Sequence, residues 1–170
     1  YDEITELEKI HRINKAVGSY YNLHTFETFS KQIKTMDDKE IIKLYSNKVI
    51  VIDEVHNLRI QDKKEGINTY KHFHRFLHLI KNSKILLMSG TPMKDTPEEI
   101  ATVMNLILPL DEQFEIKDEF TKKYIIEKKG KKKLNPNNIE ELKNKFKGRV
   151  SYLKAIVTDI KKIYNGKILE

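Results

Sequence analysis

Residues 48–56 of this 170-residue chain read KVIVIDEVH, an apolar run that ends in two acids and a histidine. The part Val49–Ile52 is short and β-branched, which is typical of a buried strand. Asp53, Glu54 and His56 stand where that strand should end, and ligands of open α/β sheets bind outside the carboxyl ends of the strands. Adjacent carboxylates are costly to bury unless they face a cation or water. We therefore expect a site for a magnesium–nucleotide complex, with an acid-rich helix start as the alternative.

A second apolar run repeats this design. Residues 84–88 (KILLM) predict another short strand, which Ser89, Gly90 and Thr91 follow. Glycine allows close approach of the backbone, and the hydroxyls can form hydrogen bonds. The separation from Glu54 to Thr91 leaves room for one helix between two parallel strands. Taken alone, these residues would equally suit a hydroxyl-capped turn. Both runs together favour one shared site.

The charge of the chain is unevenly distributed. It carries 32 Lys/Arg and 25 Asp/Glu, for a net charge of +7. Residues 117–149 contain 12 of the basic residues and only 5 of the acids, whereas the remainder is balanced. A local basic surplus suits a surface that meets phosphates, and Lys131, Lys132 and Lys133 are the candidates for nucleic-acid contact. A solvated lysine-rich face is the alternative, and we expect a basic loop at about 128–138.

Composition excludes several classes of protein. The chain has no cysteine, so disulfide scaffolds and thiolate metal sites are excluded. No uncharged apolar run approaches the roughly 18 residues of a membrane span. Tyr1 is not an initiator methionine, and the sequence after it has no signal-peptide character. We therefore expect a piece of a longer, intracellular protein without a membrane partner.

Two histidines have the spacing of a possible metal site. His74 and His78 stand four residues apart, a spacing compatible with a metal site. Zinc needs three or four convergent ligands, however, and no carboxylate motif accompanies this pair. The intervening Phe73 and Leu77 favour a helix that packs on the core. Packing is the preferred interpretation.

Periodicity, capping residues and helix breakers predict the remaining elements. Thr96-Pro97-Glu98-Glu99 has the features of a helix start, and Pro109 should end that helix. The expected helices cover residues 4–17, 69–82, 96–108, 112–129 and 139–146, residues 29–44 are mostly helix or loop, and a short strand lies near 23–25. With two parallel strands among these helices, the expected fold class is α/β.

The two strand-end sequences, in this order, resemble motifs II and III of superfamily 2 helicases and translocases. The match extends to MSGTPMKDTPEEI at 88–100, DEVHNL at 53–58 and FKGRVSY at 146–152. These segments resemble the DExH ATPases of large cytoplasmic DNA viruses, a group related to Swi/Snf-type translocases. It includes the poxvirus-type early transcription factor small subunit and nucleoside triphosphatase I. The resemblance covers roughly residues 20–155.

This resemblance implies a partial RecA-like fold. Residues 1–155 would form part of the first ATP-binding lobe, a parallel sheet flanked by helices, and 156–170 a hinge toward a second lobe. The family's phosphate-binding loop, G-x-x-x-x-G-K-[ST], is absent, because Gly18-Ser19 has neither its lysine nor its spacing. We expect that loop upstream of residue 1 and the second lobe beyond residue 170. This chain alone would hold half a site and be inactive.

The implied activity is hydrolysis of ATP, stimulated by DNA, in viral early transcription. Asp53 would hold Mg²⁺ through a bound water, and Glu54 would orient and deprotonate the attacking water. His56 would link the nucleotide site to Ser89 or Thr91 by hydrogen bonding, and so couple ATP to nucleic acid, while Ser89, Gly90 and Thr91 would also contribute to binding the nucleotide. The implied partners are double-stranded DNA, the second lobe, and a viral RNA polymerase or large transcription-factor subunit, in the virion or the host cytoplasm.

Two alternatives remain open at this point. The chain could be a non-catalytic helicase-like lobe that serves as a binding module in a polymerase or virion complex, which the missing phosphate-binding loop favours. It could also belong to the motor subunit of another superfamily 2 enzyme, such as a restriction enzyme. The residues do not distinguish strand separation from translocation, or DNA from RNA.

Overall fold

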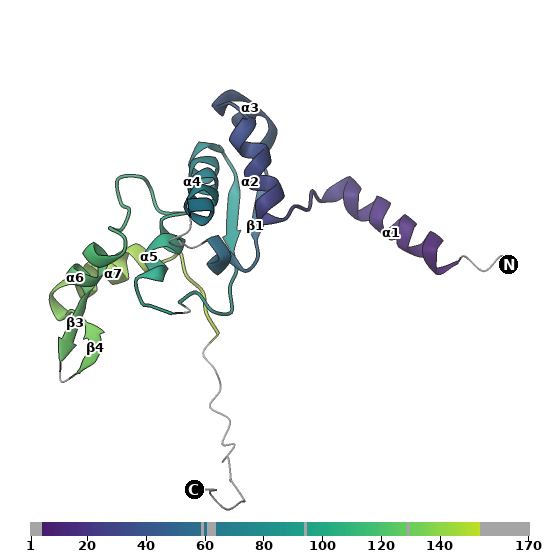
Figure 1. Cartoon of the computed structure of the whole chain (residues 1–170). Helices are drawn as coiled ribbons and strands as arrows, with labels where there is room; N and C mark the ends of the chain where they lie inside the picture. The colour runs from purple at the N-terminus through teal and green to yellow at the C-terminus, as the bar shows by residue number, and fades with distance from the viewer. Residues whose placement is uncertain (1–4, 59, 61–63, 94, 129, 154–170) are drawn as a thin grey trace, which may run out of the picture.

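The computed structural model describes residues 5–58, 60, 64–93, 95–128 and 130–153 (Figure 1). The expected hinge at 156–170 lies outside these residues. In chain order the elements are α1 (Glu6–Tyr20), α2 (Phe26–Thr35), α3 (Asp38–Tyr45), β1 (Val49–Ile52), η1 (Val55–Leu58), α4 (Lys64–Leu79), β2 (Lys84–Leu87), α5 (Glu99–Met104), α6 (Asp118–Tyr124), β3 (Ile125–Lys128), β4 (Lys131–Leu134), η2 (Pro136–Asn138) and α7 (Ile139–Phe146).

The centre of the fold is the parallel pair β1–β2, connected by α4. The register places Val49 opposite Lys84 and Ile52 opposite Leu87. This confirms the predicted α/β class, with one helix between two parallel strands, and fits a partial RecA-like fold. Because both strands run in the same direction, their carboxyl ends lie at one edge.

One face of this strand pair is packed and the other is exposed. Ile52 is buried, and Ile50 packs with it against a core formed largely by α2, α3 and α4. The buried members of this core are Phe29, Ile33, Ile41, Ile52, Val55, Leu58, Tyr70, Phe73, Phe76, Leu77, Ile80, Val103 and Leu106. The alternate strand residues Val49, Val51 and Leu86 are exposed, as the period of two in a strand requires.

A second core lies among α5, α6 and α7. Its buried residues are Ala101, Met104, Leu108, Phe114, Phe120 and Tyr124. Helix α5 joins the two cores, because Val103 belongs to the first and Met104 to the second. The Tyr70 hydroxyl of α4 donates a 3.0 Å hydrogen bond to the Thr102 carbonyl oxygen of α5, which strengthens this junction.

Several predicted boundaries were wrong. Helix α4 spans Lys64–Leu79, so it begins and ends earlier than the predicted 69–82. Helix α5 begins at Glu99 and not at residue 96 as predicted. The amides at its start bond only three residues back, as in Glu99 N to Thr96 O at 3.3 Å, whereas an α-helix bonds four residues back. No strand forms at 21–25, although Thr25 does cap α2, accepting from the Thr28 amide.

The predicted helix at 112–129 and basic loop at 128–138 also need correction. Of the described residues in that range, only Asp118–Tyr124 form an α-helix, and the chain then enters the antiparallel hairpin β3–β4. The β-branched Ile125 and Ile126 favour a strand, and Gly130, at φ +69°, occupies the left-handed region that a tight turn requires. The 3₁₀ helix η2 follows the hairpin.

Helix α1 projects from the rest of the fold (Figure 1). It starts at a capping box formed by Thr5 and Glu8 and continues through Gly18 to Tyr20, beyond the predicted end at residue 17. Its apolar stripe, including Leu7 and Ile13, is exposed. In the part of the chain that the structure describes, no helix combines the length and apolar character needed to cross a bilayer.

Candidate active site

The carboxyl ends of β1 and β2 bring the two sequence motifs together. The Met88 amide donates to the Ile52 carbonyl oxygen, and the Val55 amide donates to the Met88 carbonyl oxygen, both at 2.9 Å. The ladder thus continues past the strand ends. It fixes the loop carrying Asp53–His56 beside the loop that begins at Ser89, as the parallel topology predicted.

Glu54 has an unusual backbone conformation. Its φ is +51°, in the left-handed region that non-glycine residues rarely adopt. Two hydrogen bonds of 2.9 Å hold the turn: the Glu54 amide donates to Asp53 Oδ1, and the Asn57 amide donates to the Glu54 carbonyl oxygen. Backbone strain of this kind persists only where the surrounding structure maintains it, and it clusters at functional sites. The conformation supports a functional interpretation of Glu54.

His56 connects the two loops through one ring nitrogen. Its Nδ1 lies 3.1 Å from Glu54 Oε2, 2.9 Å from Ser89 Oγ and 3.5 Å from Thr91 Oγ1. An ionised carboxylate only accepts hydrogen bonds, so the contact with Glu54 requires a proton on Nδ1. Ser89 Oγ also accepts from the Thr91 amide at 3.0 Å. The result is a continuous chain of polar contacts from Glu54 to Thr91.

The two carboxylates are exposed, whereas the histidine is largely buried. The Glu54 side chain is 55% exposed and that of His56 only 20%, and Asp53 is also exposed. Mg²⁺ keeps several waters and binds one or two carboxylates together with substrate phosphates. An exposed Asp53 at a strand end fits that pattern. Among the described residues, no three His, Cys, Asp or Glu side chains cluster as a closed metal cage would require.

Gly90 lies in open space within the protein. A Cβ added there would meet nothing within 4 Å. Packing within the described part of the protein therefore does not require a glycine here. Thr91 is exposed beside it. Their expected role in binding nucleotide stays a prediction.

Lys131, Lys132 and Lys133 lie elsewhere. All three are exposed on β4, and Figure 1 places the β3–β4 hairpin beyond α6, away from β1 and β2. The structure therefore does not bring them together with Asp53 and Glu54.

His74 and His78 form a packing contact with a polar centre. Their ring centroids lie 4.2 Å apart with the ring planes tilted by 31°, and His78 Nε2 lies 2.9 Å from the Leu108 carbonyl oxygen. The Gln113 amide group contacts Nε2 of both histidines, at 2.8 and 3.2 Å. Burial, and then the neighbouring His78, lower the pKa of His74, which favours its neutral form.

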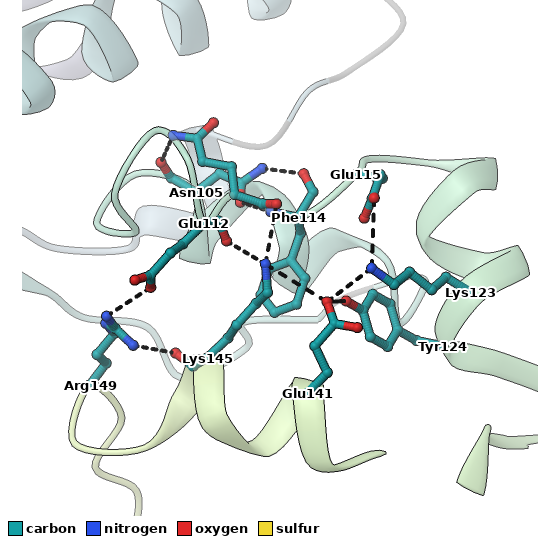
Figure 2. A network of polar contacts seen from close by, with 10 residues as sticks. Asn105, Glu112, Phe114, Glu115, Lys123, Tyr124, Glu141, Lys145 and Arg149 are labelled. Atoms are coloured by element: carbon teal, nitrogen blue, oxygen red, sulfur yellow. Dashed lines mark hydrogen bonds and ion pairs between the residues drawn. The ribbon is translucent and has the colours of Figure 1, made fainter. Parts of the chain in front are cut away.

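Sequence reasoning missed Asn105, a buried residue next to this contact. Its Nδ2 donates to the Phe114 carbonyl oxygen and its Oδ1 accepts from the Phe114 amide, both at 2.8 Å (Figure 2). An asparagine within an apolar helical run is the one signal that could have indicated it. Its role is to position the segment between α5 and α6.

Comparisons with known proteins agree with this geometry. A family model described as SNF2-related domain matches residues 6–164. The chain is 40% identical over 169 residues to the protein named "Putative helicase 009L" of Frog virus 3 (isolate Goorha), covering 99% of this chain and 17% of that protein. It is 35% identical over 131 residues to "Early transcription factor 70 kDa subunit" of Yaba monkey tumor virus (strain VR587), covering 72% and 18% respectively.

A third relative is "Putative helicase 087L" of Invertebrate iridescent virus 3, 37% identical over 158 residues, which cover 93% of this chain and 14% of that protein. The chain thus spans only 14–18% of the length of these three curated relatives. No solved structure matches the chain. The resemblance drawn from the two motifs is confirmed.

Proposed function

Because the chain belongs to the SNF2-related domain family, we propose that it forms part of the first lobe of a DNA-dependent ATPase that acts in viral early transcription. The observation that carries this proposal is the contact of His56 with both Glu54 and Ser89. It joins a candidate base for hydrolysis to the second motif. Two relatives support the proposal by their names, "Putative helicase 009L" for the helicase-type activity and "Early transcription factor 70 kDa subunit" for the role in transcription.

Glu54 is the proposed general base. Its exposed carboxylate orients a water and takes its proton as the water oxygen attacks the γ-phosphorus of ATP and the bond to ADP breaks. His56 restrains that carboxylate through Nδ1 and touches Ser89 at the same time. A change at either motif therefore alters the other. The contacts of His56 with Glu54 and Ser89 therefore couple the nucleotide site to the loop that follows β2.

Asp53 would hold Mg²⁺, through a bound water, from its exposed position next to the base. The ion, when bound, would neutralise negative charge on the phosphates of ATP. The Asp53 carboxylate also accepts a hydrogen bond from the Glu54 amide, and so stabilises the turn that carries the proposed base. Ser89, Gly90 and Thr91 complete the proposed nucleotide site from the other loop.

The sequence of this chain lacks the phosphate-binding loop of the family. No G-x-x-x-x-G-K-[ST] sequence occurs in its 170 residues. We propose that the longer protein supplies that loop and a second RecA-like lobe. Double-stranded DNA and a viral polymerase or transcription-factor subunit are the proposed partners, with action in the host cytoplasm or the virion.

The direct test is phosphate release from ATP by the full-length protein, with and without duplex DNA. The proposal predicts Mg²⁺-dependent hydrolysis that duplex DNA accelerates. Absence of hydrolysis under both conditions would contradict it. It would instead support the second candidate, a non-catalytic binding lobe, which the missing phosphate-binding loop favours.

A further inference from the structure

The structure shows where the basic surplus of residues 117–149 is located. The lysines of α6 and α7, and Arg149 after them, form ion pairs with carboxylates of the segment 112–141. Figure 2 shows the pairs of Lys123, Lys145 and Arg149. The ion pairs are Lys122–Glu119 at 2.7 Å, Lys123–Glu141 at 2.9 Å, Lys123–Glu115 at 3.7 Å, Lys143–Glu140 at 2.7 Å, Lys145–Glu141 at 4.0 Å and Arg149–Glu112 at 3.2 Å.

The hairpin lysines differ from these. Lys128, Lys131, Lys132 and Lys133 are exposed, and within the described residues none has an ion-pair partner. Outside the hairpin, Lys147 is the one other described cation of the segment in that state. The unneutralised charge is therefore concentrated on β3 and β4.

The strand register divides these lysines between two faces. Lys128 is opposite Lys131, and Ile126 is opposite Lys133. Opposite residues of an antiparallel pair point to the same side, and alternate residues along a strand share a face. Lys128, Lys131 and Lys133 consequently form one face, which we call the trilysine face. Lys132 lies on the other face, opposite Glu127.

The base of the hairpin is held firmly. The Asn135 amide donates to the Tyr124 carbonyl oxygen at 2.8 Å, and Asn135 Nδ2 donates to the Lys123 carbonyl oxygen at 3.0 Å. Asn138 Nδ2 donates to the same Lys123 oxygen. Tyr124 itself is buried in the second core. The orientation of the trilysine face is therefore fixed relative to α6 and α7.

Like charges directly opposite each other destabilise a hairpin. Lys128 and Lys131 form such a pair, and no carboxylate relieves it among the described residues. A phosphodiester backbone would relieve the repulsion, because each bound lysine releases a counterion from the nucleic acid. From this placement we infer that the trilysine face binds the phosphate backbone of duplex DNA, whereas Lys132 does not contribute. The inference rests on the proposed function, which supplies the DNA.

The test compares two triple variants of the full-length protein by fluorescence anisotropy with a labelled duplex, in the absence of ATP. One is K128Q/K131Q/K133Q. The matched control is K122Q/K132Q/K143Q, which removes the same charge from exposed lysines that are ion-paired or on the other face. The trilysine variant should raise the Kd about tenfold or more and reduce the slope of log K against log salt by about 1–3. The control should do neither.

Equal effects of the two variants, or none, would overturn the inference. It would also be overturned if the trilysine variant self-associated at unchanged DNA affinity, because lysines also protect edge strands from pairing. Selective loss of binding to phosphatidylserine vesicles, with duplex binding unchanged, would overturn it in favour of a membrane. The inference and the proposed function can fail separately. The inference stands if the wild-type protein hydrolyses no ATP but the trilysine variant loses DNA binding. It fails while the proposed function stands if the wild-type protein hydrolyses ATP and the trilysine variant binds DNA as tightly as the wild type.

Discussion

His56 Nδ1 lies 2.9 Å from Ser89 Oγ, across 33 residues of sequence, and joins the loops that follow two parallel strands. If this contact couples ATP hydrolysis to DNA, H56A should lower DNA-stimulated hydrolysis about tenfold while the rate without DNA changes less, as for a coupling of 1–3 kcal/mol. The measurement is phosphate release with and without duplex.

His72 provides the control for that variant. Its Nδ1 lies 2.8 Å from the hydroxyl of Ser30, so the pair has the same chemistry away from the site. H72A should leave DNA stimulation unchanged. Equal losses of stimulation in H56A and H72A would show that a general structural effect, and not coupling, is responsible.

Asn105 should be important for stability. N105A leaves both the amide and the carbonyl oxygen of Phe114 without their 2.8 Å partners in a buried place, which should lower the free energy of unfolding by about 2–4 kcal/mol. Urea unfolding measures this. N144A, at an exposed position of α7, should change stability by less than about 0.5 kcal/mol. Similar values for the two variants would contradict the assigned role.

Arg75 fixes the end of α2 against α4. Its guanidinium donates to the carbonyl oxygens of Ile33 at 3.2 Å and Met36 at 3.1 Å, and to the Asp38 carboxylate. R75A should destabilise the protein by about 1–2 kcal/mol in thermal or urea unfolding. R75K should recover only part of this, because an ammonium cannot reproduce the planar fork. Full recovery by lysine would show that charge alone matters.

Tyr124 should make stability fall at alkaline pH. Burial, and then its hydrogen bond to Glu141, raise the pKa of Tyr124 to about 12 from 10.0. The folded state therefore holds the proton more tightly than the unfolded state. Its contribution is complete below pH 10 and is lost as pH rises to about 12. The expected loss is about 1–3 kcal/mol.

Y124F should remove that part of the alkaline decline in urea unfolding measured from pH 9 to 12. Some decline should persist, because burial also raises the pKa of Tyr70. An unchanged profile in Y124F would contradict the assignment to Tyr124.

The central strands could be predicted because their signals are local and strong. Val49–Ile52 and the run at 84–88 are apolar, and parallel pairing then places both strand ends at one edge. The proximity of His56 to Ser89 followed from that topology. The predicted hydrogen bonding of His56 to Ser89 or Thr91 is confirmed. The contact of the same Nδ1 with Glu54 and the left-handed backbone of Glu54 were not predicted, because they depend on tertiary detail.

The β3–β4 hairpin could not be predicted in the same way. Only Ile125 and Ile126 favour a strand there, whereas the lysines that follow are typical of exposed loops. The role proposed for Lys128 could not be predicted for a related reason. Which lysines share a face depends on the register, and a slip of one residue would exchange the faces.

The measurement that tests the central claim most directly is ATP hydrolysis by E54Q in the full-length protein, with duplex DNA present. Glutamine keeps the size of the side chain but cannot take a proton from water. The account predicts unchanged ATP binding and a rate lower by about 100-fold or more. Hydrolysis near the wild-type rate would contradict the assignment of Glu54 as the base.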